Sequence, residues 1–147
     1  MRRTFFLYLI LNVTFLCATN AQIRKDGFVL SSDGTFLEKY EGVERSGIIP
    51  GSVTYIGLGA FYGCKTLKFI GIPRSVNKIG HGAFNECKNL KTVFVCWYTP
   101  LKLDHNPFSG LNLNKMTLDV PRGTRARYAS SNVWKDFGTI TEYNPVD

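Results

Sequence analysis

Hydrophobic and polar positions repeat along the middle of the chain with a period of 23 residues. The segment Ile49–Lys68 aligns with Ile72–Lys91, and both follow the pattern I-P-x-S-V-x-x-I-G-x-G-A-F-x-x-C-K-x-L-K. The apolar positions occur once in each unit, and the Pro and Gly positions mark bends. A fixed period of this length predicts a repeat architecture in which each unit stacks on the next.

A third, degenerate unit follows with one or two extra residues. Pro107–Phe108 takes the place of Ala83–Phe84, and Leu118–Pro121 repeats the apolar-x-apolar-Pro step of Ile70–Pro73. In the step between them, Cys96 stands where the other units have Pro. Cys96 is therefore a departure from the repeat.

A single unit of this length cannot bury its apolar face alone, so stacked units must share one continuous core. Each coil contributes short extended segments that lie ~4.8 Å from the next coil. The predicted core neighbours are Ile56 with Ile79, Phe61 with Phe84, and Leu67 with Leu90. The predicted fold class is a mostly β solenoid, a short coil of about three units of 23–25 residues.

The two ends of the repeat region have the composition of caps. Phe28–Leu30 and Thr35–Leu37 predict the strands of a β-hairpin, because the Ser31–Gly34 segment between them ends in the turn-forming pair Asp-Gly. This hairpin, within residues 27–47, is expected to cap the amino-terminal end.

After the repeats at 48–121, residues 122–143 are expected to form a carboxy-terminal cap with a short helix. Thr124 is the predicted N-cap of that helix. Apolar side chains would cover the last coil; they are Tyr128, Val133, Trp134, Phe137 and Ile140. Residues 22–147 thus read as a single domain.

The first 21 residues have the three-part pattern of an export signal. Arg2 and Arg3 precede an apolar run at 5–16, and small residues at 18–21 suit cleavage before the remaining chain. The run is shorter than the roughly 20 residues that a helix needs to span a bilayer. A cleaved signal peptide at 1–21 is the preferred interpretation, with a lipoprotein signal at Cys17 or an uncleaved anchor as alternatives. No later stretch approaches membrane-spanning length.

The formal net charge of +7 suggests binding to nucleic acid at first sight, but part of this charge belongs to the export signal. Arg2 and Arg3 leave with the signal, so 16 basic and 11 acidic residues give +5 on residues 22–147. An exported chain meets glycans, lipids and proteins more often than nucleic acid. No nucleic-acid partner is expected.

Three cysteines remain after the signal, an odd number that cannot pair completely within one chain. Cys64 and Cys87 occupy the same repeat position, so they lie either within disulfide distance or side by side as two buried thiols. Cys96 has no partner at an equivalent position.

The repeat units resemble leucine-rich repeats of the BspA-like type. The resemblance rests on Leu67–Val76 (LKFIGIPRSV) and Ile79–Cys87 (IGHGAFNEC), and it covers roughly Gly27 to Glu142. It implies a curved, right-handed solenoid in a secreted or surface-displayed bacterial protein that binds other macromolecules. Longer members of the family adhere to host proteins and usually carry many more repeats.

Signals for catalysis, cofactors and metals are weak. The glycine-rich segment Gly57–Gly63 recurs at Gly80–Gly82, which identifies it as a repeat bend instead of a phosphate loop. His81 and His105 lack the partners that a metal site needs, and surface exposure explains them better. Cys96 with a distant histidine is a poor candidate for thiol catalysis. A non-enzymatic protein without a cofactor or metal is expected.

Side-chain alternation selects a candidate binding face on the strand segments. The expected outward positions are Lys68, Phe69 and Gly71, then Lys91, Thr92 and Phe94, then Met116, Thr117 and Asp119. Within them, Lys68, Phe69, Lys91 and Phe94 form a basic and aromatic strip, for which a solvated face with half-buried phenylalanines is the alternative interpretation.

Trp97 and Tyr98 form a second candidate patch, because their unit departs from the repeat geometry. The leading hypothesis is a secreted or surface-exposed module that binds proteins, including host or cell-surface proteins. The alternative is binding of anionic glycans or lipid headgroups on the cell envelope; localisation is extracellular, at the cell surface or periplasmic.

Overall fold

The computed structural model describes residues 22–145 of the chain. The predicted signal peptide at 1–21 lies outside the described residues. Within residues 22–145, no helix is long and apolar enough to cross a membrane.

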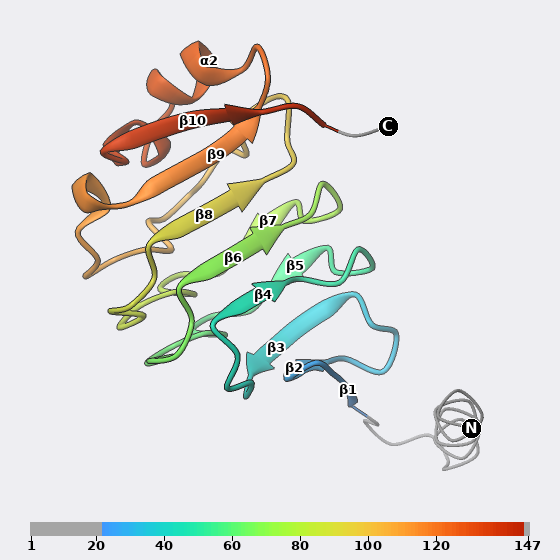
Figure 1. The fold of residues 1–147 in the computed structure, drawn as a ribbon. Helices are drawn as coiled ribbons and strands as arrows, with labels where there is room; N and C mark the ends of the chain where they lie inside the picture. Colours follow the sequence, from blue (N-terminus) through green and yellow to red (C-terminus); the bar gives the residue numbers. More distant parts are fainter. Residues whose placement is uncertain (1–21, 146–147) are drawn as a thin grey trace, which may run out of the picture.

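Short strands dominate the described part of the chain and form two five-stranded sheets. Sheet A has the order β1-β2-β3-β5-β7, and sheet B has the order β10-β9-β8-β6-β4. The strands of sheet A are β1 (Ile23–Lys25), β2 (Phe28–Leu30), β3 (Phe36–Tyr40), β5 (Tyr55–Ile56) and β7 (Lys78–Ile79). The strands of sheet B are β4 (Ser46–Ile48), β6 (Phe69–Ile72), β8 (Thr92–Val95), β9 (Thr117–Pro121) and β10 (Thr139–Tyr143). In Figure 1 the strands of sheet B lie in front, and β5 and β7 lie behind them.

The 23-residue period appears directly as the register of the parallel strands. In sheet B, Phe69 pairs with Thr92, and in sheet A, Ile56 pairs with Ile79. Successive coils therefore place equivalent residues side by side, as the repeat predicts. The strand-rich and mostly parallel pairing, with few helical residues, fits the predicted solenoid-like repeat fold.

One continuous core lies between the two sheets, and a phenylalanine stack runs through it. The rings of Phe61 and Phe84 are stacked with centroids 4.8 Å apart, and Phe108 continues the stack at 5.2 Å from Phe84. The predicted core pairs are buried, which confirms Ile56 with Ile79, Phe61 with Phe84, and Leu67 with Leu90 as core residues. Phe108 is buried in the position predicted for the degenerate unit.

Close approach of the coils explains one of the repeated glycines. A Cβ atom on Gly80 would lie 2.5 Å from the backbone nitrogen of Leu58 in the preceding coil. No other residue fits there without moving the backbone, so Gly80 is required by stacking. This supports the reading of the glycine-rich segment as a bend.

The predicted amino-terminal hairpin is present as β2 and β3, which pair antiparallel. β3 also pairs in parallel with β5, so the hairpin continues sheet A beyond the first coil. In the turn, Ser31 and Thr35 donate hydrogen bonds to the carboxylate of Asp33. These bonds lower the pKa of Asp33 to about 2.

The carboxy-terminal segment contains two helical turns and a strand. After the 3-10 helix η1 (Leu113–Lys115) and β9, the chain forms α2 (Arg125–Ala129), the 3-10 helix η2 (Trp134–Asp136) and then β10. β10 pairs in parallel with β9 and so extends sheet B. The sequence did not indicate this strand.

The N-cap of α2 differs from the expectation. Thr124 precedes the helix, but its hydroxyl donates to the carbonyl of Pro121 at 2.6 Å and makes no capping bond. The carboxylate of Glu142 on β10 instead accepts hydrogen bonds from the amides of Gly123 and Arg125. A residue of the neighbouring strand therefore satisfies the donors at the start of the helix.

Candidate functional site

The outward face of sheet B is a regular surface that the repeat creates. Alternation turns Ile70, Ile72, Val93 and Val95 into the core, where all four are buried. The residues that alternate with these four along the strands face outward. One row across the sheet, fixed by the strand register, contains Ile48, Gly71, Phe94 and Asp119.

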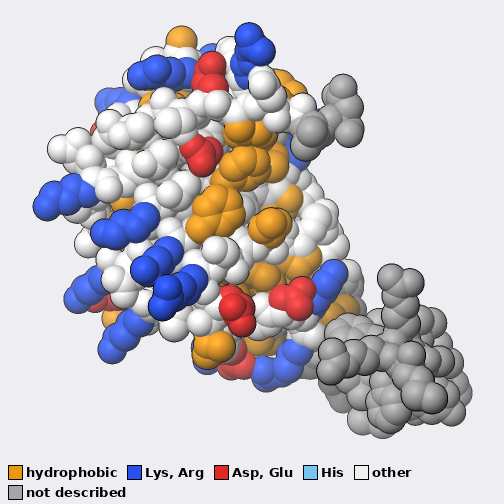
Figure 2. All heavy atoms as spheres, viewed as in Figure 1, with side chains coloured by type: hydrophobic (Ala, Val, Ile, Leu, Met, Phe, Trp, Pro, Cys, Tyr) orange, Lys and Arg blue, Asp and Glu red, His pale blue; other side chains and the backbone are white. Residues whose placement is uncertain are grey.

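Apolar side chains form a stripe on this face. Ile48 is 73% exposed, Phe69 and Phe94 are half-buried, and the rings of Phe69 and Phe94 have centroids 6.3 Å apart. Tyr143 of β10 packs on Phe94 with a centroid distance of 4.2 Å. We call Ile48, Phe69, Phe94 and Tyr143 the apolar stripe. Figure 2 shows hydrophobic side chains gathered in a band across this face.

A hollow of about 190 Å³ interrupts the apolar stripe at Gly71. Its lining is Ile48, Phe69, Gly71, Ile72, Pro73, Phe94 and Cys96. A Cβ atom on Gly71 would lie 3.4 Å from Ile48 and 3.7 Å from Phe69, both ordinary contacts. Gly71 itself is buried beneath these neighbours, and it has no side chain that would occupy the hollow.

Basic residues line the edge of this face where the strands begin, as Figure 2 shows. Arg45, Lys68 and Lys91 occupy equivalent positions: the amide of Lys68 donates to the carbonyl of Arg45 at 2.7 Å, and the amide of Lys91 donates to the carbonyl of Lys68 at 2.9 Å. All three side chains are exposed, and within residues 22–145 none forms an ion pair. We call these three residues the basic ladder.

The other end of the row carries an acidic group. Asp119 on β9 lies beside Phe94 in the register and accepts a hydrogen bond from the hydroxyl of Thr141. Partial burial raises the pKa of Asp119. Burial also raises the pKa of Tyr143, whose hydroxyl donates to the carbonyl of Val95 at 3.0 Å. This hydrogen bond fixes the ring of Tyr143 against the sheet.

The structure brings together the first predicted strip and corrects the second. Lys68, Phe69, Lys91 and Phe94 lie on the outward face, as alternation predicted. Trp97, by contrast, is 7% exposed, and its indole N–H donates to the carbonyl of Val76 at 2.9 Å.

The prediction that Trp97 lies on the surface is therefore wrong, because its ring is buried in the core and its indole N–H has a hydrogen-bond acceptor there. The prediction for Met116 is wrong for a similar reason: it is 5% exposed and belongs to the core. Tyr98 is exposed, and the guanidinium of Arg74 lies 5.3 Å from its ring centroid.

The three described thiols are free. Cys87 is buried, its thiol donates to the carbonyl of Phe61 at 3.0 Å, and burial raises its pKa to about 12. Cys64 lies near the hydroxyl of Thr66 at 3.6 Å. Cys64 and Cys87 are therefore unpaired, but only one of the two predicted buried thiols is buried, since Cys64 is half-buried.

The two histidines lie together on another part of the surface. The rings of His81 and His105 have centroids 5.7 Å apart and line a hollow of about 200 Å³ with Lys78 and Asp104. In the described part of the chain, no group of three or more His, Cys, Asp or Glu side chains is placed to hold a metal ion. Cys96 lines a different hollow, so it does not form a thiol and imidazole pair with either histidine.

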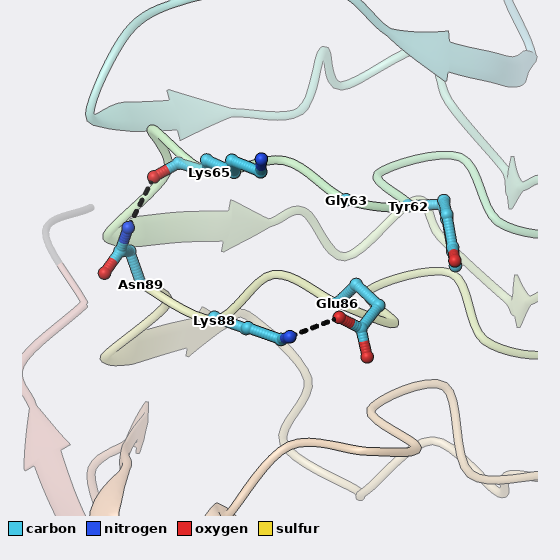
Figure 3. A pocket seen from close by; sticks show the side chains of 6 residues that line it. All are labelled: Tyr62, Gly63, Lys65, Glu86, Lys88 and Asn89. Carbon is cyan, nitrogen blue, oxygen red and sulfur yellow. Dashed lines mark hydrogen bonds and ion pairs between the residues drawn. The ribbon is translucent and has the colours of Figure 1, made fainter.

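A third concavity of about 400 Å³ lies at the bends that follow the core phenylalanines (Figure 3). Lys88 forms an ion pair with Glu86 of the same bend at 2.8 Å, and the side-chain amide of Asn89 donates to the carbonyl of Lys65 in the neighbouring bend at 2.7 Å. Glu86 has a φ of 61°, whereas the equivalent bends have Gly63 at 68° and Gly110 at 83°. A left-handed conformation costs a residue with a side chain about 1–2 kcal/mol.

Solved structures similar to this chain include three of low identity. A leucine rich cell surface protein from Faecalibacterium prausnitzii A2-165 is 21% identical, with a TM-score of 0.49, over 86% of this chain and 44% of its own. A leucine-rich repeat protein from Bacteroides capillosus ATCC 29799 is 20% identical, with a TM-score of 0.45, over 61% of this chain and 96% of its own. A leucine-rich repeat protein from Eubacterium ventriosum ATCC 27560 is 21% identical, with a TM-score of 0.47, over 83% of this chain and 39% of its own.

This chain therefore spans less than half the length of the first and third of these proteins. No curated protein matches the sequence. A family of sequences does match: the BspA type leucine rich repeat region (6 copies) corresponds to residues 45–121, just over half of the chain. These residues contain both regular units and the strands β4 to β9. The chain belongs to the BspA-type leucine-rich repeat family.

Proposed function

We propose that this chain is a non-enzymatic module that binds another protein through the outward face of sheet B. The observation that carries the proposal is the apolar stripe, above all Ile48, which is a large apolar side chain that is 73% exposed. Contiguous exposed apolar groups rimmed by charge are typical of protein interfaces. Membership of the leucine-rich repeat family supports an interaction module.

The proposal includes the location and the organisation of the chain. The signal pattern at 1–21 supports secretion, with the cell surface or the medium favoured over the periplasm, and adhesion to host or cell-surface proteins as the specific role. We further propose one domain at 22–147, in which 27–47 and 122–143 cap a right-handed coil at 48–121. Contacts of Phe28 with Phe61 and of Trp134 with Phe108 support the two caps.

The basic ladder favours a second candidate, binding of an anionic glycan or lipid headgroup. Like charges on directly adjacent strands repel each other and reduce stability. Three such charges in register, without an ion pair within residues 22–145, suit a ligand with several negative groups. Salt separates the two candidates, because exposed charge contacts weaken strongly with ionic strength and apolar contacts do not.

The test compares capture of surface and secreted proteins by two variants with the same loss of charge. One replaces Lys68, Phe69, Lys91 and Phe94 by Ala; its control replaces Lys65, Tyr62, Lys88 and Leu58, which lie at the bends. We expect the first variant to lose partners that the wild type and the control retain at physiological salt. Equal capture by all three proteins would contradict the proposal. Retention on a sulfated polysaccharide that collapses with salt, without protein capture, would favour the second candidate.

A further inference from the structure

We propose that the hollow over Gly71 is a socket for one apolar side chain of an extended, acidic segment of the partner protein. The inference rests on the proposed protein-binding function and specifies the partner of that same face. It combines the shape of the hollow with the placement of the basic ladder.

The hollow has the size and the chemistry of an apolar side-chain pocket. Its volume is about 190 Å³, and its walls are the side chains of Ile48, Phe69, Phe94 and Cys96. An apolar cavity of ~150 Å³ holds a molecule as large as benzene. A leucine, isoleucine, methionine or phenylalanine side chain therefore fits, whereas a charged group would lose its hydration without gaining a partner.

Gly71 is the one residue without a side chain in the outward row of four residues. The equivalent positions in neighbouring strands carry Ile48, Phe94 and Asp119. Gly71 does not have a positive φ, and a Cβ atom there would make only ordinary contacts. Neither backbone conformation nor crowding requires glycine, in contrast to Gly80. What its missing side chain provides is the hollow itself.

The basic ladder specifies the rest of the partner segment. Lys68 precedes Gly71 by three residues, which corresponds to about 10 Å along an extended chain at ~3.3 Å per residue. Side chains of an extended segment alternate in direction, so the residues two and four positions from an apolar anchor in the hollow, ~7 and ~13 Å away, face the same surface and lie near the basic ladder. A carboxylate at either position is complementary to Lys68 and Lys91.

Charge also argues against two other occupants. A second copy of residues 22–147 would bring its own excess of 16 basic over 11 acidic residues to a face that already carries the basic ladder. A polyanionic glycan matches the basic ladder but has no apolar side chain for the hollow. An acidic protein segment satisfies both features.

The experiment selects short random peptides, displayed on phage, for binding to the purified protein. We expect enriched peptides to carry Leu, Ile, Met or Phe with Asp or Glu two or four residues away. The Gly71→Leu variant, which fills the hollow, should weaken the binding of synthetic copies of these peptides by about tenfold or more. Gly51→Leu is the matched control, since Gly51 is exposed, has no positive φ and has open space around it.

Three further measurements keep the inference testable if Gly71→Leu destabilises the fold. Ile48→Ser removes an exposed wall of the hollow and should also weaken binding. Bound peptide should slow alkylation of Cys96, measured at that residue by peptide mapping. Replacing the peptide's carboxylates by amides should reduce affinity most at low salt.

Several results would overturn the inference. They are failure to enrich any peptide, enrichment without the apolar and acidic pair, unchanged affinity in both Gly71→Leu and Ile48→Ser, and self-association that Gly71→Leu abolishes. If peptides bind Gly71→Leu normally but lose binding when Lys68, Phe69, Lys91 and Phe94 are replaced, the socket is wrong and the proposed face stands. If they bind that variant normally too, both proposals fail.

Discussion

The two regular coils and the carboxy-terminal third of the chain solve the same packing problem by different means. In the regular coils, equivalent residues stack on one another, as in the pairing of Ile56 with Ile79 and the stacking of Phe61 on Phe84. In the later part, the repeat lapses and aromatic side chains bond to backbone atoms of distant segments. A regular unit packs against the equivalent residues of the next unit, whereas an irregular segment depends on specific hydrogen bonds.

In addition to the bond of Tyr143 to Val95, three large aromatic residues make such bonds. The indole of Trp97 donates to the carbonyl of Val76, the hydroxyl of Tyr128 donates to the carbonyl of Trp97 at 2.7 Å, and the indole of Trp134 donates to the carbonyl of Leu101 at 2.8 Å. Each bond satisfies a backbone acceptor that no neighbouring strand reaches. The comparison predicts different penalties for mutations in the two regions.

The largest effect is expected in the regular coils. Phe84→Ala removes the central ring of the phenylalanine stack and should reduce the free energy of unfolding by roughly 3–5 kcal/mol, measured by chemical denaturation. Tyr62→Ala, at a side chain that is 66% exposed, is the control and should change it by less than about 0.5 kcal/mol. A loss below about 1 kcal/mol for Phe84→Ala would show that the stack is not the centre of the core.

A smaller effect is expected in the irregular region. Trp97→Phe keeps an aromatic ring but leaves the buried carbonyl of Val76 without its donor, at a cost of about 1–3 kcal/mol in unfolding free energy. Tyr98→Phe, at the adjacent exposed residue, should have little effect. Equal stability of the two variants would mean that packing alone holds the irregular coil.

The smallest effect is expected at the bend of Glu86, where a residue other than glycine has a positive φ. Glu86→Gly relieves the positive φ that Gly63 and Gly110 adopt freely, so it should raise the unfolding free energy by up to about 1 kcal/mol. The reciprocal change Gly63→Ala should lower it by a similar amount. Thermal unfolding of both variants provides the measurement; a destabilised Glu86→Gly would indicate that the ion pair with Lys88 outweighs the strain.

The sequence predicted the features that repetition controls. A shift of 23 residues was enough to align Ile56 with Ile79 and to place Lys68, Phe69, Lys91 and Phe94 on one face, because parallel register and alternation carry that information. The hollow was not predictable in the same way. Alternation identifies Gly71 as outward, but the walls come from residues of neighbouring strands.

The sequence failed where tertiary contacts decide burial. Trp97 looked like a surface residue because its unit lacks the repeat pattern, and only the carbonyl of Val76 explains its burial. β10 lies beyond the last unit, so no repeat copy could reveal it; the alternation of Thr139, Ile140 and Thr141 is the local signal that could have done so. The contribution of Glu142 to the helix start likewise depends on β10.

The row of Ile48, Gly71, Phe94 and Asp119 separates two kinds of sequence constraint. The inward row beside it, which consists of Gly47, Ile70, Val93 and Leu118, is buried and uncharged in every strand, whereas the outward row differs from strand to strand in size and polarity. Gain or loss of a whole unit by recombination would preserve the core and insert or delete one residue of the outward row. Such a protein can diversify this outward surface in steps of one coil, and point substitutions in the row can refine each step without a new fold.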